Sequence, residues 1–222
     1  MHSLGAMSEP KAKARSLQEV VPGVYHWYVQ DDRIGARSDA YAVVDRDGAV
    51  VLIDPLPIDE SLLQPLGSIT AIVLTAGNHQ RSAWRFRKRF NVPVWVPRDA
   101  HGLEEEPDTV YGNGDTLPGG LNAFHTPGPA HVMYTLWMQQ SPRGVVFLSD
   151  LLIHPEEGSP EFVPSEHQDE PVRTRMSVQR VIDHLPVDTL CFAHGEPIVR
   201  DGEQVLRKAL EQDSEGASAP AP

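Results

Sequence analysis

The stretch Val73–Trp84, VLTAGNHQRSAW, decides the fold of this chain. It begins inside the apolar, β-branched run Ser68–Thr75, SITAIVLT, which predicts a buried strand. A short turn follows, and the apolar spacing that follows it predicts a helix over His79–Phe90. Pro93–Val96 then predicts a second strand parallel to the first, because a helical crossover joins neighbouring parallel strands. The stretch is therefore the centre of a βαβ unit.

Strands and helices are predicted on both sides of this unit. Arg46–Gly48 joins two strands as a hairpin, since Asp-Gly supplies the positive φ of a tight turn. Leu152–Pro171 carries four prolines and predicts a long loop. The other predicted strands are Val24–Val29, Tyr41–Asp45, Ala49–Ile53, Leu121–Thr126, Val132–Gln139, Gly144–Leu148 and Thr189–Ala193. The other predicted helices are Asp59–Leu66, Arg173–Leu185 and Gly202–Leu210.

Composition limits the classes of protein and of site. The 222 residues, 40% of them hydrophobic, favour one globular domain, and the net charge of −12 argues against nucleic acid or anionic lipid as the main partner. The one cysteine, Cys191, excludes an intramolecular disulfide and any site built from several thiolates. None of the ten histidines lies within five residues of another, so local His-x-His and HExxH metal motifs are excluded.

The two ends are predicted to lie outside the folded domain. Residues 1–16 are expected to be a flexible N-terminus, of which 1–6 could be an expression remnant, and 17–210 a single domain. The small, polar residues 211–222 predict a disordered tail. No stretch has the apolar length of a signal peptide core or a membrane span, so we expect a cytoplasmic protein with no membrane partner.

Polar residues follow several of the predicted strands. Ala76–His79 follows one strand, and Ser149 with Asp150 follows another. His125 lies one residue before the end of a third strand, and His194 follows the last. Because side chains at the carboxyl ends of adjacent strands meet at one crevice, these positions form the default ligand site.

The order and spacing of five segments resemble the metallo-β-lactamase superfamily. These segments are AYAVVDRDGAVVLIDP, VLTAGNHQRSAW, FHTPGPAH, VVFLSD and FAHGEPI, and together the resemblance covers about residues 20–210. It implies an α+β fold, an αββα sandwich of two mixed β-sheets flanked by helices. It also implies a hydrolase with two zinc or iron ions at the strand ends, which lower the pKa of a bound water.

The chain departs from the family's metal motif, Thr-His-x-His-x-Asp-His. Ala76, Asn78, Gln80 and Arg81 stand at its four ligand positions, and Pro129 stands at the next histidine. The resemblance implies that only two ligand positions have the family's residue, Asp150 at the bridging aspartate and His194 at the last histidine. Two ligands are fewer than the three or four protein donors that zinc sites use. The crevice is expected to be lined by Ala76, Asn78, His79, Gln80, Arg81, His125, Pro129, His131, Asp150 and His194.

Two hypotheses follow. The first is a protein of this fold with a degenerate metal site and no cofactor, a pseudoenzyme candidate in which Arg81 pairs with Asp150 in place of the metal. It would bind a small molecule or a protein partner, and a homodimer is a further alternative. The second is a hydrolase of an ester, thioester or lactone. Its catalytic candidates are Asp150 and His194, and zinc, iron or manganese at partial occupancy would be bound by this pair with His79 or His131.

Each candidate also has an ordinary structural interpretation. Asp150 and His194 could be polar groups retained for packing. His79 could be a surface residue or a helix cap, and Arg81, on a helix with four other basic residues, could be a solvated charge. Enzyme activity therefore remains open at this level.

Overall fold

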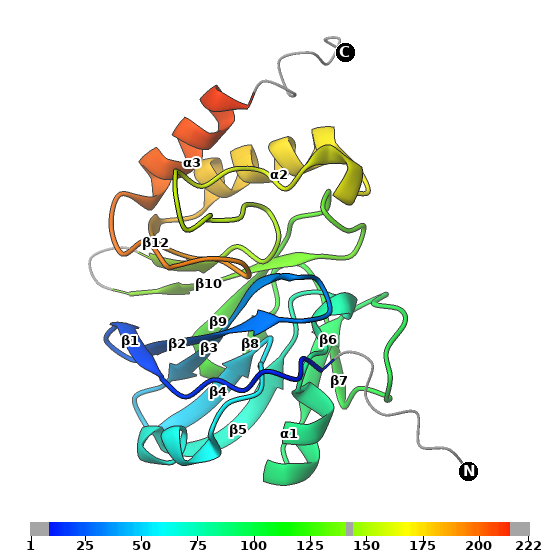
Figure 1. Cartoon of the computed structure of the whole chain (residues 1–222), viewed down its shortest axis with the longest axis vertical. Helices are drawn as coiled ribbons and strands as arrows, with labels where there is room; N and C mark the ends of the chain where they lie inside the picture. The colour runs from blue at the N-terminus through cyan, green and yellow to red at the C-terminus, as the bar shows by residue number, and fades with distance from the viewer. Residues whose placement is uncertain (1–8, 141–143, 214–222) are drawn as a thin grey trace. The chain divides into compact units, whose positions relative to one another are not determined.

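The computed structural model of the chain describes residues 9–140 and 144–213. The chain forms two compact units, Met1–Tyr111 and Gly112–Pro222, called here the first and the second unit. Each unit contains one mixed β-sheet with helices beside it (Figure 1). The predicted α+β class with two mixed, helix-flanked sheets is confirmed.

The sheet of the first unit has seven strands in sequential order. Strands β1 to β4 pair antiparallel, and β4 to β7 pair parallel. The strands are β1 (Gln18–Val21), β2 (Val24–Asp31), β3 (Ala36–Val44), β4 (Ala49–Ile53), β5 (Ser68–Val73), β6 (Val94–Pro97) and β7 (Thr109–Tyr111). The predicted parallel pairing of Pro93–Val96 with the strand before it is confirmed by β5 and β6.

Local sequence explains the turns and core of this sheet. The hairpin between β3 and β4 closes as predicted: Asp45 accepts hydrogen bonds from the amides of Asp47 and Ala49, and Gly48 has a φ of 78°. Trp27, Leu52 and Phe86 belong to a buried apolar cluster that joins the sheet to helix α1 (Ala83–Phe90). Burying such side chains is the main favourable term in folding.

One predicted helix of the first unit is wrong. Residues 59–66 form two short 3₁₀ turns, η1 (Glu60–Leu62) and η2 (Gln64–Leu66), rather than one helix. Pro65 lies at the start of the second turn, where it has no amide hydrogen for a continuing helix. Asp59 caps the first turn and accepts a hydrogen bond from the amide of Ser61.

The sheet of the second unit has five strands in the order β12-β11-β10-β9-β8. Strands β11 and β12 pair parallel and the others antiparallel. The strands are β8 (Thr116–Leu117), β9 (Leu121–His125), β10 (Tyr134–Gln139), β11 (Gly144–Phe147) and β12 (Val187–Cys191). Helices α2 (Pro171–His184) and α3 (Gly202–Gln212) lie together beside this sheet (Figure 1). The predicted loop before α2 contains the short turn η5 (Ser165–His167), and η4 (Pro118–Gly120) connects β8 to β9.

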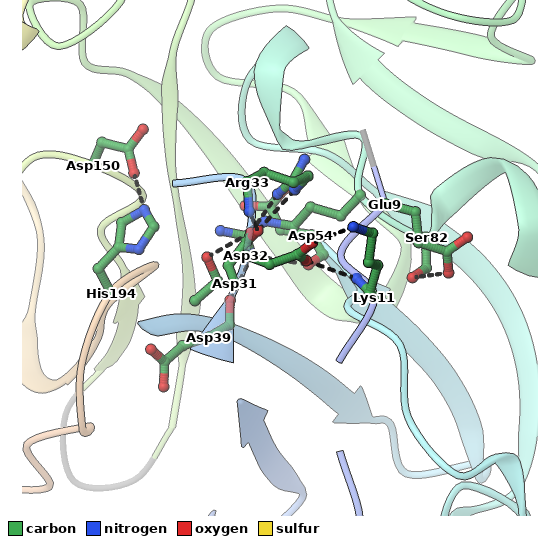
Figure 2. Close-up of polar contacts among 12 residues, drawn as sticks. Glu9, Lys11, Asp31, Asp32, Arg33, Asp39, Asp54, Ser82, Asp150 and His194 are labelled. Atoms are coloured by element: carbon green, nitrogen blue, oxygen red, sulfur yellow. Dashed lines mark hydrogen bonds and ion pairs between the residues drawn. The ribbon is translucent and has the colours of Figure 1, made fainter. Parts of the chain in front are cut away.

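The described parts of both chain ends make specific contacts. Ala14 is buried and exchanges backbone hydrogen bonds with the Pro57–Asp59 segment. The Glu9 carboxylate accepts a hydrogen bond from the Ser82 hydroxyl (Figure 2). It also accepts one from Arg85. Helix α3 continues to Gln212, two residues into the expected tail. The other end residues, 1–8 and 214–222, lie outside the described part of the chain. No helix among the described residues is long and apolar enough to cross a membrane.

Candidate functional site

The motif stretch after β5 forms a 3₁₀ turn and a separate helix. The turn η3 spans Gly77–His79, and α1 begins only at Ala83, so the predicted continuous helix from His79 is wrong. Arg81 has a φ of 43°, in the left-handed region that interrupts a right-handed helix. Ala76 and His79 are buried, while Asn78 is exposed. His79 is therefore not the surface residue that one interpretation of the sequence allowed.

His79 belongs to a buried network with Asp54 and Thr75. Asp54 follows β4, and its Oδ1 accepts a hydrogen bond from the Thr75 amide at 2.8 Å. Its Oδ2 accepts from the Thr75 hydroxyl at 2.5 Å and lies 2.9 Å from Nδ1 of His79. Parallel pairing of β4 with β5 brings these strand ends together. The carboxyl ends of adjacent parallel strands are the usual place for a ligand site.

The Gln80 side chain is fully engaged in the first unit. Its amide nitrogen donates to the carbonyls of Gly77 at 2.9 Å and Gly102 at 3.0 Å. Its amide oxygen accepts from Trp84 Nε1 at 2.8 Å and from the Glu104 amide at 2.7 Å. This residue, which stands at the motif's aspartate, fastens η3 and α1 to the loop after β6.

The Arg81 side chain is buried, with 3% of the residue exposed. Its Nη1 donates to the backbone carbonyls of Asp39 at 2.6 Å and Asp54 at 3.1 Å. The Asp39 carboxylate lies 2.6 Å from His26 Nε2 and accepts three hydrogen bonds from Arg37. Arg81 is thus part of a buried charged network and not a solvated charge. Its pairing with Asp150 stays a prediction.

The second unit brings Asp150 and His194 together. Parallel pairing of β11 with β12 aligns the two strand ends from which these residues follow. Asp150 Oδ1 lies 3.5 Å from His194 Nε2, and both side chains are partly exposed, by 17% and 22% (Figure 2). Ser149 just before Asp150 has a φ of 54°. Non-glycine residues in this conformation cluster at functional sites.

The turn after β9 carries His125, Pro129 and His131. His131 Nδ1 lies 3.1 Å from a carboxylate oxygen of Glu170, and its amide donates to Asp169. Its side chain therefore contacts the acidic end of the loop before α2. Whether His131 also serves in place of Pro129 as a metal ligand stays a prediction, as does the lining of a crevice by this turn.

Two ionisable groups at this turn have shifted pKa values. Burial lowers the pKa of the His125 imidazole, and the positive charges of Arg173 and Arg180 lower it further. A hydrogen bond with the His131 carbonyl acts in the opposite direction. A hydrogen bond from Arg173 lowers the pKa of the Glu170 carboxyl. His125 is therefore neutral, and Glu170 charged, near neutral pH.

Comparison with known proteins decides the family. The sequence profile described as Metallo-beta-lactamase superfamily matches residues 15–212, most of the chain. The chain belongs to the metallo-β-lactamase superfamily. None of the curated proteins compared with this metallo-β-lactamase-fold chain matches it.

Solved structures of metallo-β-lactamases share the fold. The FIM-1 enzyme from Pseudomonas aeruginosa, in its mono-zinc form, aligns with a TM-score of 0.70 at 14% identity over 96% of this chain and 100% of its own. The DIM-1 enzyme exposed to ceftazidime aligns with a TM-score of 0.70 at 12% identity over 90% and 97%. The enzyme from Pontibacter korlensis gives 0.66 at 16% identity over 89% and 99%. At these identities the likeness concerns the fold alone.

Sequence reasoning missed Asp54 and Asp39, which organise the charged network of the first unit. Asp54 had a visible signal, because Ile53-Asp54-Pro55 places a carboxylate directly after a buried strand, as Ser149-Asp150 does. Asp39 lies inside β3, where its burial beside His26 and Arg37 depends on the pairing of β2 with β3. Only the folded sheet reveals that contact.

Proposed function

We propose that this chain is a metallo-β-lactamase-fold protein without the superfamily's dinuclear-metal hydrolase activity, which retains a crevice for a small molecule or a protein partner. The observation that carries the proposal is the set of hydrogen bonds made by the Gln80 side chain. All four of its amide hydrogen bonds go to groups of the first unit. A side chain committed in this way to holding η3, α1 and the following loop is not available as a metal ligand.

The donor chemistry of the other motif positions also does not fit two metal ions. Ala76 and Pro129 have no side-chain donor, and Asn78 offers only a neutral amide. Arg81 brings a permanent positive charge to a ligand position, and its guanidinium is bound to two backbone carbonyls. Zinc sites use three or four protein donors, whereas only Asp150 and His194 have the residue type of the family's ligands at the family's positions.

Asp150 and His194 are the groups that we assign to ligand contact. A carboxylate and an imidazole 3.5 Å apart can together accept and donate hydrogen bonds, and their partial exposure leaves both within reach of a bound molecule. The net charge of −12 favours a small molecule or a protein over nucleic acid as that partner.

Elemental analysis of the full chain, purified without chelator, tests this proposal. We expect zinc, iron and manganese together far below one ion per chain. One or two tightly bound ions per chain would overturn it. The unfolding midpoints of Asp150→Ala and His194→Ala serve as a fold control. They should be nearly unchanged if these residues serve ligand contact rather than packing.

The second candidate is a metal-dependent hydrolase with rearranged ligands, which the Asp54–His79 contact favours. Metal-binding histidines commonly donate their second ring nitrogen to a carboxylate. This candidate predicts a bound metal and turnover of an ester, thioester or lactone that Asp150→Ala or His194→Ala abolishes. Equal activity of these variants and the unmodified chain would exclude it.

A further inference from the structure

Residues 9–14 form a strap on the first unit. At one end of the strap, Glu9 contacts the start of α1, and at the other Ala14 exchanges backbone hydrogen bonds with the loop after β4. Between these ends, the Lys11 amide donates to Asp32 Oδ1 at 2.9 Å, and the Lys11 ammonium lies 3.4 Å from Oδ2 (Figure 2). Asp32 lies at the tip of the hairpin that joins β2 to β3. The strap therefore links this hairpin tip to the helix that follows the family's motif positions.

Glu9 supplies a negative charge that the first turn of α1 lacks. That turn contains no acidic residue, and within the described chain the Ser82 hydroxyl makes no capping hydrogen bond to it. The hydroxyl instead donates to Glu9 Oε1 at 2.7 Å, and Arg85 Nε donates to the same oxygen at 2.7 Å. A carboxylate is favourable here because the N-terminus of a helix is the positive end of its dipole. Since Ser82 directly follows Arg81, this contact also fixes the end of the motif stretch.

One buried proline separates the two outer contacts of the strap. Pro10 stands between Glu9 and Lys11, and its ring fixes the backbone φ at about −65°. Ala12 then packs against the apolar core of the first unit. The side chains of Arg85 and Lys11 are 39% and 91% exposed, so each ion pair alone is a weak attachment. Because the link between the two contacts is short and stiff, loss of one contact should weaken the other.

We propose that the strap is a conformational device that couples the β2–β3 hairpin to the start of α1. When the outer end of the strap, from Glu9 to Lys11, detaches, the hairpin tip and the first turn of α1 loosen together while the sheet keeps its fold. This goes beyond the proposed function, because it concerns the mobility of the first unit and not metal or ligand contact. Local openings of this kind cost less free energy than global unfolding, and hydrogen exchange detects them.

Hydrogen exchange of the full chain, followed amide by amide by NMR, tests the proposal. The Gly35 amide, which donates to the Asp31 carbonyl at 2.9 Å, reports on the hairpin tip. The Phe86 amide, which donates to the Ser82 carbonyl at 2.9 Å, reports on the first turn of α1. In Glu9→Ala we expect both amides to exchange about fivefold faster, the factor that loss of a helix cap typically brings. Faster exchange of Phe86 alone, or of neither amide, overturns the proposal.

Asp32→Ala tests the same coupling from the hairpin, and it decides the matter if Glu9→Ala does not fold. It removes the acceptor of the Lys11 amide at a residue outside α1. We expect the Phe86 amide to exchange faster by a similar factor, because coupling between two sites is reciprocal. An unchanged rate at Phe86 contradicts the coupling.

Pro10→Gly tests the route of the coupling, since Arg81 also links the motif stretch to β3 through the Asp39 carbonyl. This variant keeps both outer contacts of the strap but removes the stiff link between them. Adding Asp32→Ala to it should therefore no longer affect the Phe86 amide. An effect that persists in this background would assign the coupling to Arg81 and overturn the role of the strap.

Glu60→Ala is the matched control. Glu60 accepts a hydrogen bond from Arg85 at 3.2 Å, as Glu9 does, but it lies in η1 and not in the strap. Its loss should leave the Gly35 amide unchanged, and faster exchange there would show that Arg85 rather than the strap carries the effect. The Leu74 amide, which donates to a carbonyl of β6, should keep its rate in every variant, because the sheet stays folded.

Discussion

At the scale of single residues, Gln80→Glu isolates the group that stands at the motif's aspartate. The substitution keeps the length of the side chain but turns its NH₂ group into an oxygen that faces the carbonyls of Gly77 and Gly102. Two carbonyls lose their donor in a site that is 5% exposed, so we expect a loss of about 3 kcal/mol in the free energy of unfolding. Urea unfolding measures it. The exposed Gln64→Glu should change stability by less than about 0.5 kcal/mol, and an equal effect of both variants would contradict this account.

The residue scale also separates what the sequence could predict about the site from what it could not. The register of Ala76, Asn78, Gln80 and Arg81 in the motif is a property of the sequence alone. The partners of Gln80 are not, because two of them come from the loop after β6, more than 20 residues away. Arg81 likewise bonds the carbonyls of Asp39, inside β3, and of Asp54, directly after β4, which only tertiary structure brings near.

At the scale of elements, Gly128 sets how the turn after β9 packs on α2. A Cβ atom at Gly128 would lie 2.3 Å from the Thr174 amide nitrogen, and its φ is 140°. Gly128→Ala should therefore cost about 2–4 kcal/mol in thermal or urea unfolding, through both the contact and the backbone. Gly158→Ala is the matched control, because Gly158 has a φ of 117° and open space around it. This variant should lose about 1 kcal/mol, the cost of the backbone conformation alone. Equal losses of unfolding free energy in the two variants would contradict the close packing of Gly128 on α2.

Element prediction succeeded where the signal was local and failed where it was not. The Asp-Gly hairpin and the β5–β6 pairing follow from short patterns and are confirmed. The short strands β1, β7 and β8 were not predicted, since two to four residues carry little periodicity. The helix expected from His79 begins only at Ala83, because Arg81 has a left-handed backbone conformation and its side chain bonds a carbonyl of the first sheet.

At the scale of the whole molecule, the order of the motifs along the chain was enough to predict the fold class. Five segments between Ala40 and Ile198 carry the family's sequence pattern, and residues 15–212 match its profile. The fold persists at 12–16% identity to solved enzymes because a core needs apolar side chains of suitable volume rather than particular ones. Metal binding, in contrast, requires particular side chains. Because the fold depends on the core and not on those side chains, it does not require the metal ligands.

The stability of the whole chain should consequently be independent of zinc. An ion bound at 100 times its dissociation constant would add about 2.7 kcal/mol to the free energy of unfolding. For a chain of this size that corresponds to a rise in Tm of about 5–10 °C. We expect scans with excess zinc and with chelator to agree within about 1 °C, well below that linkage effect. Magnesium at the same concentration controls for ionic strength, and a rise of several degrees with zinc alone would show that rearranged ligands hold a metal ion in the folded protein.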